Sequence, residues 1–437
     1  MVSFSSLTDD ILLEIFSYLP LNSVYKFKCL SKVWLSNLSN PNFTIKWFQV
    51  NYKSLPWIHY DTVNCDNLFA DKSPLRFRKA YPELHSEFMS RNMFAFKFFI
   101  TEKPFVEAIL FVLGSSNGLA LCLSIPRNST EGRRYHVCNP LTQTWVSLPE
   151  PPRRGYPASY LDLSGIFCEQ SSSSFASSYK VVRIPLTDRP SEKFSVDIFS
   201  SDLGVWESFQ VLCDEIVALN SSKYHNAIIL NGVMFWIEGG DKMLVYNLNQ
   251  EYNSDGHQCS LINLPDEDNE YDSDMILGES EGRVCYARIR IIQREATVSV
   301  WMLDEVNWVV LHNDISIDGI FADMQFETDQ VVRRGIKILG FSPVDHNVVL
   351  ICCKDRVWGF NIQTKSFEEL CLDNKHRYDE GSRMIRPVVL TPMPTVLPPP
   401  SWIEKEIILT EPEAPLISKI GGWEKIKITN AKRMKTV

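Results

Sequence analysis

Residues 7–20 read Leu-Thr-Asp-Asp-Ile-Leu-Leu-Glu-Ile-Phe-Ser-Tyr-Leu-Pro, and this stretch decides how the start of the chain folds. Its large apolar residues recur on one wide helical face, at Ile11, Leu12, Ile15, Phe16 and Leu19. Thr8 stands where a helix N-cap is expected, and two acidic residues follow in the first turn, where the helix dipole favours negative charge. Pro20 ends the pattern. The stretch therefore predicts an amphipathic helix over 9–19 that Thr8 caps.

Two more short helices are predicted in this head of the chain. The first begins at about residue 22, and its apolar stripe consists of Val24, Phe27 and Leu30. The second runs over 32–38 and ends before Pro41. Three helices in so short a segment bury too little apolar surface to be stable alone. Because the segment carries no metal ligands, a partner surface is expected to cover part of it.

From residue 93 to 396 the pattern changes to short runs of β-branched and aromatic residues separated by turn residues. These runs form five units of three strands each, which begin at Asn117, Tyr179, Asn231, Gly282 and Asn347. A repeat of roughly 50–60 residues predicts a kelch-like β-propeller of five to six irregular blades. A sixth blade would combine Met93–Leu113 with Pro387–Val396. The alternative is a twisted β-sandwich of short strands.

The predicted fold class is therefore mainly β, with a small α-helical domain at the N-terminus. The expected domains are a three-helix head at 1–48, a linker at 49–92 and the β-propeller at 93–396, followed by a flexible tail at 397–437. Some helix is expected in the linker around 74–89. Lys432–Lys435 form a short basic cluster near the end of the tail.

Composition and charge exclude several classes of protein. The 437 residues include 44 Lys and Arg against 53 Asp and Glu, a net charge of −9, whereas nucleic-acid and anionic-membrane binding need a basic face. No apolar run approaches the ~20 residues of a membrane helix. The 11 cysteines include no C-x-x-C pair and the histidines are scattered singly. We expect free cysteines, no metal, no cofactor, and a location in the cytoplasm or the nucleus.

Three local patterns have both a functional and a structural interpretation. Gly114–Gly118 satisfies the G-x-S-x-G nucleophile pattern, but an apolar strand follows it, so a tight β-turn is favoured. The acidic run 266–274 lacks the frame of a calcium loop and reads as a solvated loop. Trp145, Trp206 and Trp308 each open a strand after a polar turn, which favours packing between blades over a ligand cage.

The order and spacing of residues in the head closely resemble an F-box. The residues that carry this resemblance are 7–20, Val24, Phe27–Lys32 and Trp34. The body is similar to plant F-box proteins with a kelch-like F-box-associated domain, at Ser115–Leu119, Cys138–Thr142, Tyr179–Val182, Leu230–Val233 and Ser299–Trp301. One departure is Thr8, where the family usually has Pro, and this difference bears on the affinity for the adaptor.

The resemblance implies a substrate receptor of an SCF-type cullin–RING ubiquitin ligase that is not itself an enzyme. The F-box would dock on a Skp-type adaptor, and through it on the cullin and RING subunits, while the propeller would hold an unknown protein substrate. The residues expected to contact the adaptor are Leu7, Ile11, Leu12, Ile15, Phe16, Leu19, Pro20, Leu21 and Val24. The residues expected to hold the helices together are Phe27, Leu30 and Trp34.

Two other functions fit the same pattern less well. One is a non-catalytic propeller that binds a small ligand or a glycan and uses its F-box as an anchor. The other is an enzyme on a kelch-like propeller, which would need titratable residues that converge on an open site.

Overall fold

The computed structural model describes the head and most of the body. The described residues are 8–51, 57–61, 108–126, 133–139, 144–152, 162–168, 178–187, 189–219, 227–248, 259–265, 274–292, 295–318, 336–353, 356–370 and 385–389. The helix expected at 74–89, the acidic loop up to residue 273 and the tail at 397–437 lie outside them. Among the described helices, none has the length and apolar character that crossing a membrane requires.

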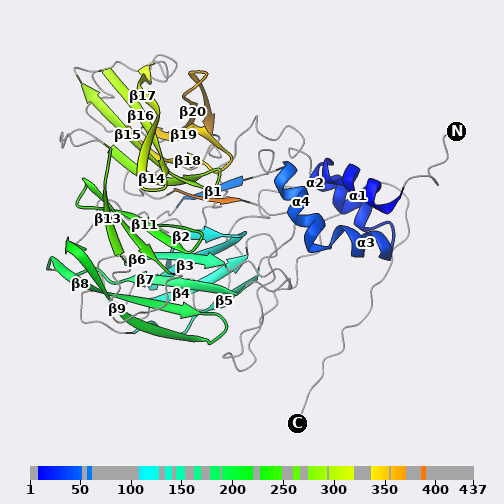
Figure 1. Ribbon diagram of the computed structural model, residues 1–437, viewed down its shortest axis with the longest axis horizontal. Helices are drawn as coiled ribbons and strands as arrows, with labels where there is room; N and C mark the ends of the chain where they lie inside the picture. Colours follow the sequence, from blue (N-terminus) through cyan, green and yellow to red (C-terminus); the bar gives the residue numbers. More distant parts are fainter. Residues whose placement is uncertain are drawn as a thin grey trace, which may run out of the picture. The chain divides into compact units, whose positions relative to one another are not determined.

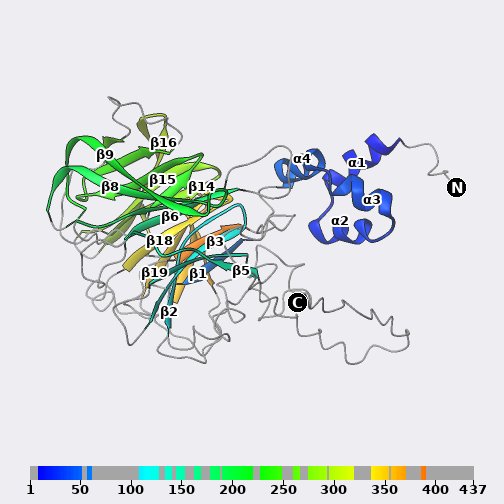
Figure 2. The ribbon, with the colours of Figure 1, turned by 90° about the horizontal axis from the view of Figure 1, so that it is seen from below.

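The described part of the head consists of four helices rather than three. They are α1 (Asp9–Ser17), α2 (Leu21–Lys28), α3 (Lys32–Leu38) and α4 (Pro41–Asn51) (Figure 2). The prediction missed α4 because Pro41 reads as a helix stop. Proline is in fact favoured at the first helical position, where its missing N–H has no partner to lose. The backbone N–H of Asn42 donates to Oδ1 of Asn40 at 2.9 Å, which satisfies one donor of the first turn.

The caps of the helices differ from the prediction at one position. Thr8 does occupy the N-cap of α1, but its side chain makes no capping hydrogen bond, so the predicted cap is wrong. The backbone carbonyl of Thr8 instead accepts the N–H of Leu12 at 3.1 Å. Ser31 does cap α3, because its hydroxyl accepts the N–H of Trp34 at 3.1 Å.

The helices of the head enclose a small apolar core. Its buried members are Phe16, Val24, Leu38, Phe43 and Trp47. The indole N–H of Trp47 donates to the carbonyl of Leu19 at 2.8 Å, and the amide of Asn51 donates to the carbonyl of Ser17 at 2.7 Å. The core and these two bonds hold α4 against the end of α1.

The body is built from antiparallel four-stranded sheets (Figure 1). The first contains β2 (Ala108–Ser116), β3 (Leu119–Pro126), β4 (Arg134–Asn139) and β5 (Thr144–Ser147). The second contains β6 (Leu163–Cys168), β7 (Tyr179–Ile184), β8 (Ser191–Ser200) and β9 (Val205–Val217), and the third contains β10 (Ile228–Leu230), β11 (Val233–Glu238), β12 (Lys242–Asn247) and β13 (Cys259–Asn263). The fourth contains β14 (Asp274–Ser280), β15 (Arg283–Ile292), β16 (Glu295–Asp304) and β17 (Asn307–Ser316), and the fifth contains β18 (Ile336–Ser342), β19 (Asp345–Cys353), β20 (Arg356–Asn361) and β21 (Ser366–Leu370). The outer strands β9 and β13 also meet in a short parallel pairing, which joins the second and third sheets.

The first strands of successive sheets form a closed ring. β2 contacts β6, β6 contacts β10, β10 contacts β14 and β14 contacts β18. A sixth sheet of two described strands, β1 (Trp57–Asp61) and β22 (Ile385–Val389), completes the circle, because β22 contacts both β18 and β2. This arrangement is a β-propeller and excludes the β-sandwich.

The sixth sheet corrects two predictions. The strand that pairs with the end of the body is Trp57–Asp61, from the segment expected to be a linker, with Trp57 opposite Val389. The described part of Met93–Leu113, residues 108–113, belongs to β2 in the first blade, and the rest of that range lies outside the described residues. The sequence around residue 57 has no clear period of two, so pairing with a distant strand decides its structure.

Each of the five complete blades also has one strand more than predicted, because the inner strand was left out of all five units. Four of these inner strands contain glycine, at 114, 165, 278 and 340, and glycine weakens a strand signal. The glycines at 165 and 278 allow neighbouring inner strands to approach closely. A Cβ at Gly165 would lie 2.7 Å from Cδ1 of Ile229 in the next blade, and one at Gly278 would collide with the ring of Phe341.

Tight hairpins join inner strands to the strands that follow them. Both central residues have positive φ in Asn117-Gly118, Asn231-Gly232 and Glu281-Gly282, as two-residue type I′ turns require. The first of these turns confirms the β-turn predicted in the Gly114–Gly118 motif, whose first three residues end β2 and whose last two form the turn. Ser116 ends β2, and its hydroxyl accepts the N–H of Cys168 in the second blade at 3.1 Å. The G-x-S-x-G serine therefore joins two blades.

Candidate functional site

Helix α1 carries two apolar stripes on different faces. Leu12, Phe16 and Leu19 pack into the core of the head. Ile11, Ile15 and Tyr18 follow the same i, i+4, i+7 spacing but are 47%, 46% and 63% exposed, and we call these three residues the outward stripe. A row of exposed large apolar side chains on one helix face is typical of a surface that a partner covers.

Polar contacts fix the orientation of α1. Glu14 forms an ion pair with Lys46 of α4, and the hydroxyl of Ser17 donates to the carbonyl of Glu14 at 2.7 Å. The ring of Phe16 lies 4.6 Å from that of Phe27 and meets Trp34 edge-on at 5.0 Å. Glu14 is thus held against α4, and Phe16 is held against Phe27 and Trp34. The outward stripe therefore points away from the core of the head.

The structure divides the residues predicted to contact an adaptor into two groups. Ile11, Ile15 and Pro20 are exposed, whereas the remaining described members, which are Leu12, Phe16, Leu19 and Val24, are half-buried or buried in the core. Leu7 and the side chain of Leu21 lie outside the described residues. The contact role of every member stays a prediction.

The predicted core set needs one correction. Phe27 and Trp34 pack around Phe16 as expected, but Leu30 is 69% exposed and does not hold the helices together. The reason is local: α2 ends at Lys28, and Leu30 lies in the turn after it, where its N–H bonds to the carbonyl of Phe27 at 3.1 Å. The chain has left the helical stripe before it reaches Leu30.

Sequence reasoning missed several exposed apolar residues of the head. They are Tyr18, Val33, Leu35, Ile45 and Val50. Tyr18 could have been found, because it continues the spacing of Ile11 and Ile15. Ile45 and Val50 lie on α4, the helix that was not predicted, so no helical face could be assigned to them.

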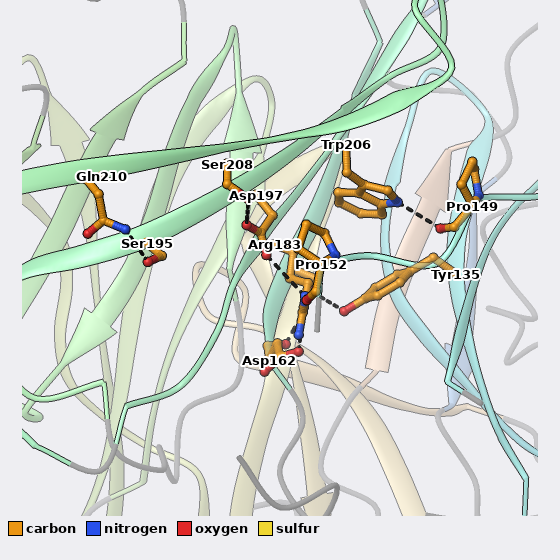
Figure 3. Close-up of polar contacts among 11 residues, drawn as sticks. Tyr135, Pro149, Pro152, Asp162, Arg183, Ser195, Asp197, Trp206, Ser208 and Gln210 are labelled. Carbon is orange, nitrogen blue, oxygen red and sulfur yellow. Dashed lines mark hydrogen bonds and ion pairs between the residues drawn. The ribbon is translucent and has the colours of Figure 1, made fainter. Parts of the chain in front are cut away.

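The body contains a buried polar cluster between its first two blades, shown in Figure 3. Nε of Arg183 donates to Asp162 at 2.7 Å, and its Nη1 donates to Asp197 at 3.1 Å and to the carbonyl of Pro152 at 3.0 Å. Ser208 donates to the other oxygen of Asp197 at 2.7 Å. The side chain of Asp197 is fully buried and that of Arg183 is 12% exposed. The cluster therefore joins the two blades, and its burial makes it inaccessible to a substrate.

Two other titratable side chains of the first blade are equally inaccessible. Burial and the nearby Asp162 carboxylate raise the pKa of Tyr135 to about 12, so its hydroxyl stays protonated beside Ser164 at 3.1 Å. Burial lowers the pKa of His136 to about 3, and the neutral ring lies 2.8 Å from the hydroxyl of Ser124. His136 is fully buried. These groups stabilise the blade and cannot meet a substrate.

Two of the three predicted inter-blade tryptophans do bridge blades. Trp206 of β9 donates its indole N–H to the carbonyl of Pro149, after the first blade, at 2.8 Å. Trp308 of β17 donates to the carbonyl of Asn263 in the third blade at 3.0 Å. Trp145 instead packs edge-on against His136 of its own blade at 5.7 Å. In the part of the chain that the structure describes, no group of three His, Cys, Asp or Glu side chains could hold a metal ion.

The comparison with known families agrees with this arrangement of a helical head and a propeller. The family model "F-box protein At3g26010-like, beta-propeller" matches residues 93–388, more than half of the chain. The chain belongs to this F-box protein family. The model of the F-box domain itself matches residues 4–46, which include the outward stripe. The resemblance predicted from the sequence is thereby confirmed.

Similar F-box proteins from Arabidopsis thaliana extend over most of the chain. F-box protein At5g03970 is 24% identical over 374 residues, which are 83% of this chain and 82% of the relative. F-box protein At5g49610 is 25% identical over 302 residues, or 68% and 72% of the two chains. The putative F-box/kelch-repeat protein At4g22430 is 23% identical over 390 residues, or 86% and 82%.

Proposed function

We propose that this F-box protein is the substrate-recognition subunit of an SCF-type cullin–RING ubiquitin ligase. Its F-box docks on a Skp-type adaptor, and its β-propeller holds a protein substrate for ubiquitination. The protein performs no chemistry itself. Its contribution is effective concentration, because a lysine of a tethered substrate stays close to the ubiquitin-loaded enzyme.

The outward stripe is the observation that carries this proposal. Ile11 and Ile15 are about half exposed although they lie in the middle of a helix whose other stripe is packed. Covering such side chains contributes roughly 25 cal/mol for each Å² of apolar surface removed from water. An adaptor with an apolar groove would gain this free energy without any change in the core of the head.

The body supports the role of a receptor rather than that of an enzyme. The titratable groups described above, Arg183, Asp197, Tyr135 and His136, lie inside or between blades. The proposed location is the cytoplasm or the nucleus. In support, the eight described cysteines are all free and seven of them are buried, which suits a reducing compartment.

The test uses the full-length protein in cells. Wild type and Ile15→Asp are expressed with an affinity tag, adaptor recovery is measured, and the half-lives of co-purified proteins are followed in a chase. The proposal expects Ile15→Asp to lose the adaptor, to keep its captured partners and to lengthen their half-lives. Unchanged half-lives of every captured partner would instead favour the anchored ligand-binding or glycan-binding module.

A further inference from the structure

The outermost strand of the fourth blade, β17, and the turn before it expose apolar side chains. Val306, Val309 and Val310 are 64%, 44% and 55% exposed. β17 pairs with β16 on one side, and no described strand pairs with its other side (Figure 1). Natural proteins usually protect such an edge with lysine, proline or a covering segment. The described part of β17 contains neither lysine nor proline.

Two features limit the open edge to 307–310. Trp308 turns inward, where its N–H bonds to Asn263 of the third blade at 3.0 Å and its ring lies 5.8 Å from that of Tyr286. The pairing with β16 is regular from Asn307 to Val310 and then shifts register twice, because residues beyond Val310 form bulges. Bulges interrupt a ladder, so the short regular stretch is the part that could accept another strand.

The charge of this hairpin has a single sign. Residues 295–318 contain Glu295, Asp304, Glu305, Asp314 and Asp318 and no lysine or arginine. Two arginines of β15 lie near this hairpin, Arg283 at 3.9 Å from Asp304 and Arg290 at 4.0 Å from Asp314. Glu305 lies exposed in the turn beside Val306. The apolar edge is therefore bordered by carboxylates.

The second blade has a comparable hairpin that differs in its edge. Leu203, Val205, Leu212 and Ile216 are exposed there. Cys213 of β9, however, pairs with Cys259 of β13, so part of that edge is already occupied. Asp202 and Leu203 of the β8–β9 turn correspond in chemistry to Glu305 and Val306, which makes this hairpin a matched control.

We propose that the edge of β17 at 307–310 binds an extended partner segment in which apolar residues alternate with lysine or arginine. The segment adds a strand to the fourth blade. Its apolar side chains pack on Val310, on one face of the sheet, and its cations lie on the opposite face, which carries Asp304, with Glu305 in the adjoining turn. A second copy of this chain is disfavoured as the occupant, because the carboxylates beside its own edge would repel Asp304 and Glu305. The inference rests on the proposed function and names the class of substrate segment that the propeller would recognise.

The test measures binding of synthetic peptides to the full-length protein by fluorescence anisotropy. The probe is labelled Lys-Val-Lys-Val-Lys-Val-Lys, and its controls are the block peptide Lys-Lys-Lys-Lys-Val-Val-Val and the alternating peptide N-methylated at each valine. The variants Glu305→Lys and Val309→Lys are compared with Asp202→Lys and Val205→Lys, which make the same charge reversal and the same valine-to-lysine change on the second blade.

We expect the alternating probe to bind about tenfold more tightly than either control peptide. Glu305→Lys and Val309→Lys should each weaken binding by about tenfold, and the second-blade variants by less than about twofold. Equal weakening by Asp202→Lys, or equal binding of the N-methylated peptide, would overturn the proposal. So would a wild-type dimer in sedimentation that Val309→Lys dissociates.

The same variants separate this inference from the proposed function. Adaptor recovery is measured for each one, and Val309→Lys should keep the adaptor. Loss of the peptide site with adaptor binding intact supports the edge as a distinct site. Failure of peptide binding in the wild type, with adaptor binding intact, overturns the inference and leaves the receptor proposal standing.

Discussion

Ile15 and Phe16 are consecutive residues of α1, yet Ile15 is 46% exposed and Phe16 is 7% exposed. One residue along a helix turns the side chain by about 100°, which is enough to move it from the outward stripe to the core. A substitution at one position should therefore affect binding, and a substitution at the other should affect stability.

Ile15→Asp should abolish recovery of the adaptor. The aspartate is harmless in the free protein, because the position is half exposed, but in the complex it becomes an unpaired buried charge that costs several kcal/mol. Pull-down of the adaptor with the full-length variant measures the effect. Ile216→Asp, at a 64% exposed position of β9, is the matched control and should retain the adaptor. Full retention by Ile15→Asp would contradict the docking model.

Phe16→Ala should destabilise the head by about 3–5 kcal/mol, because it removes the ring between Phe27 and Trp34 and leaves a cavity. Thermal unfolding followed by helical circular dichroism measures the loss. Ile11→Ala is the control, with a change of less than about 1 kcal/mol at its exposed position. If the two variants unfold alike, Phe16 does not have the structural role that its burial indicates.

Arg183→Leu should destabilise the body by about 3–5 kcal/mol, because it leaves the fully buried Asp197 without its guanidinium partner. Chemical denaturation followed by tryptophan fluorescence measures the change. The double variant Arg183→Leu with Asp197→Asn removes the orphaned charge and should recover part of the stability. If the double variant loses as much as the two single changes added together, the two side chains are not coupled.

Trp206→Phe should cost about 1–2 kcal/mol, since it removes the hydrogen bond to Pro149 but keeps most of the ring contact. Trp206→Ala should cost more, about 3–5 kcal/mol, because the ring contacts with Tyr135 and Phe199 are lost as well. Urea midpoints of the two variants give the comparison. Equal losses would mean that the inter-blade hydrogen bond, and not the ring packing, supplies the stability.

His136 should make the body less stable as the pH falls. Its pKa is about 3 in the folded protein and about 6.5 in an unfolded chain, so between these values only the unfolded state binds the proton. Stability is fully present above about pH 6.5 and decreases by a few kcal/mol towards pH 3. Denaturation at pH 7, 5 and 4 measures the slope, and His136→Gln should flatten it. An unchanged slope in His136→Gln would contradict this assignment.

The sequence was sufficient for features that local patterns determine. In each of the five complete blades, the outer three strands coincide with runs of β-branched and aromatic residues between turns. Helix α3 was predicted at its observed bounds, Lys32–Leu38. The F-box resemblance rested on residue order over one short segment. The outward stripe could also have been separated from the core stripe, because both follow the same helical spacing.

The remaining features depend on contacts that the sequence does not display. The inner strands carry glycines, such as Gly165 and Gly278, because a neighbouring strand approaches closely. β1 acquires its structure from a strand at the other end of the body. The exposure of Leu30 follows from the point at which α2 ends, and helix ends are the least certain part of a sequence-based assignment.

The pairing of β1 with β22 has a consequence for the synthesis of the protein. Trp57 leaves the ribosome long before Val389 is made, so the ring cannot close until the rest of the propeller has emerged. During this interval the inner strands of the first and fifth blades each lack one neighbour and present apolar edges. A nascent chain that stops before Ile385 should therefore be a substrate for chaperones and proteases even though its five complete blades are present.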